Sequence, residues 1–114
     1  MAASEFRIGI DATSMLPPLT GVGNYTHALV RALAQNHRDL HLVLFVNSLR
    51  RQLPDEPFLH LPNVTVRRFR IPGPLLWRAW LHFDAPAIDR LIGEVDLFHS
   101  PSGHVPPLHS GASV

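Results

Sequence analysis

The chain contains the run Thr20-Gly21-Val22-Gly23-Asn24-Tyr25, and a short apolar run, Arg7-Ile8-Gly9-Ile10-Asp11, precedes it. From Val22 to about Gln35, apolar side chains recur at steps of three and four residues, which predicts an amphipathic helix. The first N–H groups of a helix have no intrahelical acceptor and carry partial positive charge. Since glycine lets a ligand approach the backbone closely, this loop and helix predict a phosphate or diphosphate contact. The predicted contact residues are Gly21, Val22 and Gly23.

A simpler interpretation of the two glycines is that they only let the chain turn into the helix. Glycine pairs at helix starts are common, so the segment alone leaves both interpretations open. The dinucleotide fingerprint G-x-G-x-x-G is incomplete, because Thr26 stands where its third glycine would be. The loop after Asp11 is also too long for the tight turn of that motif.

The composition excludes several classes of function. The chain has 114 residues, 46% of them hydrophobic, and a formal net charge of +1, so it can form a folded core and gives no reason to expect a nucleic-acid partner. It has no cysteine, which excludes disulfides, thiolate zinc sites and a cysteine nucleophile. The first residues do not resemble a secretory signal, and no apolar run approaches the length of a membrane span. We predict a cytoplasmic protein, with the inner face of the membrane as a further location.

Strands and helices alternate along the chain. A continuous apolar run indicates a strand buried on both faces, whereas the charged third strand suits a sheet edge. A short helical turn is predicted at about residues 48–53, and residues 75–92 are predicted to be helical with an interruption near Pro86. Residues 102–114 are predicted to be a loop. The four predicted strands are residues 6–10, 42–46, 64–69 and 95–99.

Such alternation predicts an α/β fold with a partial Rossmann-like parallel sheet, helices on both faces and strand order 3-2-1-4. The order of the strands reverses between the first and the fourth, and ligands bind past the carboxyl ends of the strands at that point. His99 ends the fourth strand there, beside the glycine loop. Its imidazole can donate a hydrogen bond or transfer a proton near neutral pH, so His99 is the candidate catalytic residue. The alternative is a structural histidine bonded to a nearby carbonyl.

Two other clusters of side chains are candidate sites. His99, His104 and His109 are spaced five apart, but no carboxylate or supporting residue accompanies them, so no metal site is predicted. A basic and aromatic cluster could rest on an anionic membrane, although packing of its tryptophans against the sheet is the commoner arrangement. The members of the basic and aromatic cluster are Arg67, Arg68, Arg70, Trp77, Arg78 and Trp80.

Two segments resemble the family 4 retaining glycosyltransferases, which have the GT-B fold. Residues 8–12, 18–26 and 29–33 resemble the opening of these enzymes. Val95-Asp96-Leu97-Phe98-His99-Ser100-Pro101, followed by Val105-Pro106-Pro107, resembles their fourth-strand region. The likeness spans nearly the whole chain in the same order.

The resemblance implies two Rossmann-like domains facing across a cleft, with the acceptor held mainly by the amino-terminal one. Gly21 and Gly23 would lie near the donor diphosphate, and His99 would face the transferred sugar. The reaction would transfer a hexose, such as mannose or glucose, from a nucleotide sugar to a sugar or lipid-linked acceptor. The donor is a substrate, and neither a metal nor another cofactor is expected.

Residues 1–114 would then be an incomplete amino-terminal, acceptor-side domain without the donor domain, and inactive by itself. An unpaired strand edge beside the fourth strand would make it prone to association. The alternative is a self-contained Rossmann-like module that binds a small phosphorylated ligand without chemistry.

Overall fold

The computed structural model describes residues 6–83, 87–101, 108 and 112–113. Within these residues the strands form one parallel sheet in the order β3-β2-β1-β4-β5. The predicted α/β fold with strand order 3-2-1-4 is confirmed, and β3 lies at the predicted edge. The strands are β1 (Phe6–Asp11), β2 (Leu40–Asn47), β3 (Val64–Phe69), β4 (Leu97–His99) and β5 (Ala112–Ser113).

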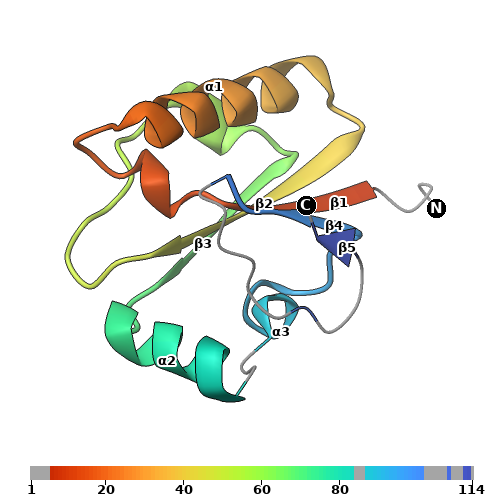
Figure 1. Cartoon of the computed structure of the whole chain (residues 1–114). Helices are drawn as coiled ribbons and strands as arrows, with labels where there is room; N and C mark the ends of the chain where they lie inside the picture. The colour runs from red at the N-terminus through yellow and green to blue at the C-terminus, as the bar shows by residue number, and fades with distance from the viewer. Residues whose placement is uncertain (1–5, 84–86, 102–107, 109–111, 114) are drawn as a thin grey trace.

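Helices cover both faces of the sheet (Figure 1). The helix α1 (Gly21–Asn36) lies on one face, and α2 (Gly73–Phe83) and α3 (Ile88–Ile92) lie on the other. The interruption predicted near Pro86 falls on residues 84–86, which lie outside the described residues. Two 3-10 helices complete the described elements, η1 (Thr13–Met15) and η2 (Pro57–His60).

The central position of β2 explains why its sequence is continuously apolar. Its residues 42–46 are all buried. Leu42, Leu44 and Val46 belong to the core under α1, whereas Val43 and Phe45 belong to the core under α2 and α3. Because successive side chains of a strand point to opposite faces, a central strand covered by helices on both sides needs apolar residues at every position.

Gly9 allows β1 to lie close to the second core. A Cβ added at Gly9 would lie 2.7 Å from Cδ1 of Phe98 and 2.9 Å from Cδ1 of Ile92. Both side chains are buried in the core under α2 and α3. The absence of a side chain at Gly9 therefore makes room for Phe98, which anchors the short strand β4 beside β1.

Three predictions about the connections were wrong. The helical turn lies at η2 rather than at residues 48–53. Pro57 begins η2, because its fixed φ suits the first position of a helix. At the predicted place, the Ser48 hydroxyl only accepts a turn hydrogen bond from the Arg51 N–H at 2.9 Å. Residues 102–114 are not entirely loop, because Ala112 and Ser113 form β5. The expected unpaired edge beside β4 is also wrong, since Leu97 pairs with Ala112 and Phe98 with Ser113. The strand β5 could not be predicted, because two residues are too few to carry a periodic pattern.

Candidate functional site

The first turns of α1 and the end of β4 meet at the carboxyl edge of the sheet. β1 and β4 lie side by side, with Ile10 paired to His99. The rings of His99 and Tyr25, in the second turn of α1, are in edge contact, with centroids 6.5 Å apart and planes 71° apart. The predicted convergence of these two segments, which lie far apart in the sequence, is confirmed by the strand pairing and the ring contact.

The amino terminus of α1 is partly capped by its own chain. The Thr20 hydroxyl accepts a hydrogen bond from the Gly23 N–H at 3.3 Å, and the Asn24 N–H donates to the Thr20 carbonyl at 2.8 Å. Helix geometry leaves the N–H groups of Gly21 and Val22 without intrahelical acceptors. Both residues are exposed, so these two donors are the ones that an anion can reach.

The two glycines have different surroundings. A Cβ at Gly21 would meet no atom within 4 Å, whereas a Cβ at Gly23 would lie 2.4 Å from the Ser14 carbonyl oxygen. Gly23 therefore lets α1 pack closely on η1, and its N–H is already donated to Thr20. Gly23 therefore has a packing role, which differs from the turn considered above, and the predicted ligand contact remains a prediction.

Thr26, at the position of the third glycine of the dinucleotide fingerprint, is completely buried. Its hydroxyl donates to the Val22 carbonyl at 2.7 Å and lies 3.2 Å from the Ser14 hydroxyl. The helix packs on η1 through the contact between Thr26 and Ser14 and the close approach at Gly23, rather than through a third glycine.

The end of β4 holds two buried polar atoms without partners. Within the described part of the chain, neither Nε2 of His99 nor the hydroxyl of Ser100 has a hydrogen-bond partner. Leaving such a group unpaired costs free energy, and unpaired groups in native proteins often have a functional explanation or bind an additional molecule. The structural interpretation of His99, a ring nitrogen bonded to a carbonyl, is not observed for Nε2. Ser100 and Tyr25 also belong to this site, although the sequence analysis assigns them no role.

A pocket of about 400 Å³ opens beside this site, between the ends of β1 and β2 and the helix α2. Aromatic side chains form much of its wall. Of its polar members, Asp11 accepts a hydrogen bond from the Thr13 N–H at 3.1 Å, and the Asn47 amide pairs at both ends with the backbone of Ile71, at 2.9 and 3.0 Å. Neither Gly21 nor His99 lines this pocket. The lining residues are Asp11, Thr13, Ser14, Phe45, Asn47, Gly73, Leu76, Trp77 and Trp80.

The histidines do not gather into a metal site in the described residues, where no group of three or more metal-ligating side chains occurs. Instead, several histidines each contact one other polar side chain. His27 contacts Glu56 at 2.9 Å, His41 contacts the Thr65 hydroxyl at 2.9 Å, and His60 contacts Asp55. His104 and His109 lie outside the described residues.

The basic and aromatic cluster separates into packed and exposed members. Trp80 packs against the second core, with its ring 6.3 Å from that of Phe45. Trp77 is 41% exposed, and Arg67, Arg70 and Arg78 are exposed as well. The packing interpretation therefore holds for Trp80.

Comparisons with protein-family models, with curated proteins and with solved structures found no match to this chain. Among the described residues, no helix has the length and apolar character needed to cross a membrane.

Proposed function

We propose that this chain is the acceptor-side domain of a retaining glycosyltransferase that transfers a hexose from a nucleotide sugar. The observation that supports the proposal is the meeting of the α1 amino terminus with His99 at the carboxyl edge of the sheet, between β1 and β4. In open α/β sheets this switch point is where ligands bind. The resemblance of both segments to family 4 glycosyltransferases gives that general site a specific reaction.

In this proposal the N–H groups of Gly21 and Val22, which have no intrahelical acceptors, bind the donor diphosphate. Two adjacent donors at a helix amino terminus suit an anion, because the helix dipole adds to the hydrogen bonds. The resemblance implies that His99 faces the transferred sugar. The donor would be shared with a second domain on the other side of the cleft.

The acceptor occupies the pocket formed by β1, β2 and α2. A sugar presents both C–H faces and hydroxyl groups, and the pocket offers the aromatic rings of Trp77 and Trp80 together with the Asp11 carboxylate. This pocket lies at the same edge of the sheet as His99, because Asp11 follows directly on Ile10, the partner of His99.

The chain permits a sharp test of the diphosphate contact. Gly21 is the first residue of α1, where proline is tolerated, and Thr20 before it is extended (φ −94°, ψ −175°), as a residue before proline should be. Gly21→Pro removes one N–H without removing the helix start. Gly21→Ala retains that N–H and fits, since nothing lies within 4 Å of the added Cβ.

Binding of pyrophosphate, UDP, UDP-glucose and GDP-mannose is measured by amide and imidazole chemical shifts. We expect saturable shifts at Val22 and His99 in the native chain and in Gly21→Ala, with affinity lowered about tenfold in Gly21→Pro. Shifts confined to other parts of the chain, or equal binding by all three proteins, would refute the proposal. Tight binding of pyrophosphate with no effect of an attached sugar would favour the phosphate-binding module instead.

A second proposal concerns the exposed side of α2, which we propose rests on an anionic membrane surface. Its apolar side chains Leu75, Leu81 and Phe83 are 61, 62 and 79% exposed. Residues 57–83 contain four arginines and no acidic residue. A helix that combines exposed apolar and basic residues binds at the interface of anionic lipids.

The test is sedimentation with vesicles of phosphatidylcholine, with and without phosphatidylglycerol. We expect binding only to the anionic vesicles, weakened by salt and by Leu81→Ser. Leu49→Ser is the matched control, because Leu49 is 53% exposed but lies away from α2, between β2 and η2. If both variants bind as the native chain does, or none binds, α2 does not serve as a membrane contact.

A further inference from the structure

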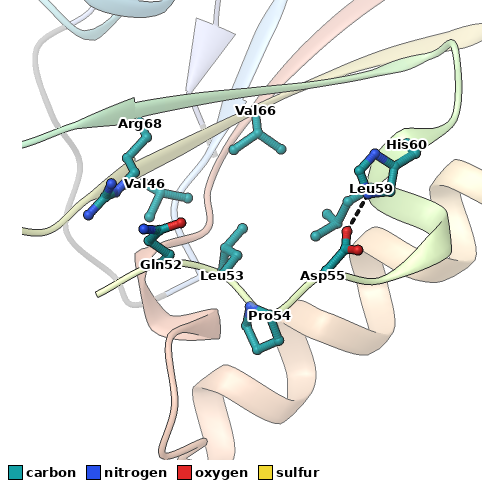
Figure 2. A pocket seen from close by; sticks show the side chains of 9 residues that line it. All are labelled: Val46, Gln52, Leu53, Pro54, Asp55, Leu59, His60, Val66 and Arg68. Carbon is teal, nitrogen blue, oxygen red and sulfur yellow. Dashed lines mark hydrogen bonds and ion pairs between the residues drawn. The ribbon is translucent and has the colours of Figure 1, made fainter. Parts of the chain in front are cut away.

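A second pocket, of about 420 Å³, lies on the α1 side of the sheet at its β3 edge. Figure 2 shows it between the strands β2 and β3 and the segment that leads into η2. It shares no residue with the pocket beside Asp11, and neither His99 nor the glycines of α1 line it. Its lining residues are Val46, Gln52, Leu53, Pro54, Asp55, Leu59, His60, Val66 and Arg68.

The middle of this pocket is apolar. Val46 is 1% exposed and forms its floor, and Leu53 and Leu59 are half-buried beside it. Val66 is 38% exposed, because the open side of the pocket leaves its side chain uncovered. A ligand with an apolar body would remove these side chains from water, which is favourable in proportion to the area covered.

The two ends of the pocket are polar but differ in charge. Asp55 and His60 form a pair at one end (Figure 2), and their side chains are 87 and 70% exposed, so this pair lies at the rim in water. Arg68 and Gln52 lie at the other end. Arg68 is half-buried, and its Nε is shielded from solvent without a hydrogen-bond partner among the described residues.

The position of Arg68 follows from the strand. Val66 and Arg68 are two residues apart in β3 and therefore point to the same face, whereas Arg67 points to the opposite one. Arg68 pairs in register with Val46 of the floor. A partly buried guanidinium next to an apolar surface favours an anionic partner, because its hydrogen bonds to a carboxylate or phosphate are charge-assisted and can be bidentate.

We propose that this pocket binds a small anionic amphiphile, with its carboxylate or phosphate on Arg68 and its apolar body over Val46, Leu53, Leu59 and Val66. The volume lies in the range of small-molecule sites. The charged end fixes the orientation of the ligand and the apolar middle supplies most of the contact. This proposal is independent of sugar transfer, since the two sites share no residue.

The test uses octanoate and octyl phosphate as probes, at concentrations below those at which they form micelles, with octanol and octylamine for comparison. Methyl and amide chemical shifts of the full chain report where each probe binds. We expect saturable shifts at Leu53, Leu59 and Val66 with both anions, and much weaker binding of octanol and octylamine. Preference between the two anions distinguishes a carboxylate from a phosphate ligand.

Variants test the role of each part. Arg68→Gln should raise the Kd of octanoate roughly 10- to 100-fold, as expected for loss of a charge-assisted hydrogen bond. Arg67→Gln is the matched control, because it removes the same charge from the opposite face of β3 and should leave the Kd unchanged. Val66→Trp should abolish binding by filling the pocket, and it carries the test if Arg68→Gln does not fold.

The proposal is overturned if neither anion shifts the pocket resonances. It is equally overturned if the shifts spread over α2 instead, or if Arg67→Gln weakens binding as much as Arg68→Gln does. Unchanged octanoate binding by a folded Val66→Trp variant would also contradict it.

Discussion

At the residue scale, Gly21 and Gly23 show how two glycines of one motif can have different roles. Gly23→Ala places a Cβ 2.4 Å from the Ser14 carbonyl oxygen, which belongs to backbone and cannot move away easily. We expect the free energy of unfolding to fall by about 1–3 kcal/mol. Urea unfolding of the variant measures this change. Gly21→Ala is the control and should alter it by less than about 0.5 kcal/mol, so equal effects of the two substitutions would contradict the packing role.

Nε2 of His99 has no hydrogen-bond partner among the described residues, which leads to a prediction that separates the two interpretations of this histidine. Phenylalanine in its place retains a ring against Tyr25 and removes the buried polar atom. If His99 serves a ligand, His99→Phe should leave the free energy of unfolding unchanged or raise it by up to about 1 kcal/mol. Thermal and urea unfolding give the answer. A loss above about 2 kcal/mol would instead indicate a structural histidine.

At the scale of elements, Asn63 joins three of them. Its side-chain amide, within a residue that is 5% exposed, donates to the carbonyls of Ala34 at 3.2 Å, His37 at 3.4 Å and Leu40 at 3.2 Å. These carbonyls belong to the end of α1 and the start of β2. A single side chain just before β3 thus donates to carbonyls at the carboxyl end of the helix, whose last carbonyls have no intrahelical partner.

Asn63→Ala should therefore lower the free energy of unfolding by roughly 2–3 kcal/mol, because buried carbonyls lose their donor. Asn36→Ala, at the exposed last residue of α1, is the control and should change it by less than about 0.5 kcal/mol. Chemical denaturation of both variants, with α1 followed by circular dichroism, provides the measurement. Similar stability of the two variants would show that Asn63 does not hold these elements together.

For the whole molecule, the sequence predicts the sheet better than it predicts the sites. The apolar run of β2 and the alternation of strands with helices indicate the topology, because central parallel strands need apolar residues on both faces. The apolar spacing after the two glycines similarly indicates α1, with its start predicted at Val22, one residue after the observed start at Gly21. The short β5 carries no such pattern, and its pairing with β4 depends on contacts that are distant in the sequence.

The sites were less predictable because their members come from separate segments. Asp11, Asn47 and Trp77 share a pocket although they lie in β1, β2 and α2. Likewise Arg68 looks like any member of an arginine cluster until the strand places it beside Val46. The convergence of His99 with α1 could be predicted because the strand order alone determines it, whereas the packing role of Gly23 requires the position of Ser14.

The distribution of burial also predicts which part of the molecule opens first. β2 is paired on both sides and buried along residues 42–46, whereas Leu76 is the one buried residue described in α2. Regions with few buried apolar contacts open at lower free energy than the core.

Native-state hydrogen exchange should therefore find the slowest amides in β2 and β1 and much faster exchange throughout α2. If α2 exchanges as slowly as β2, the helix is held by more than Leu76 and Trp80, and its exposed apolar side would need a permanent partner. If anionic vesicles slow exchange in α2 alone, the same measurement supports α2 as the membrane contact.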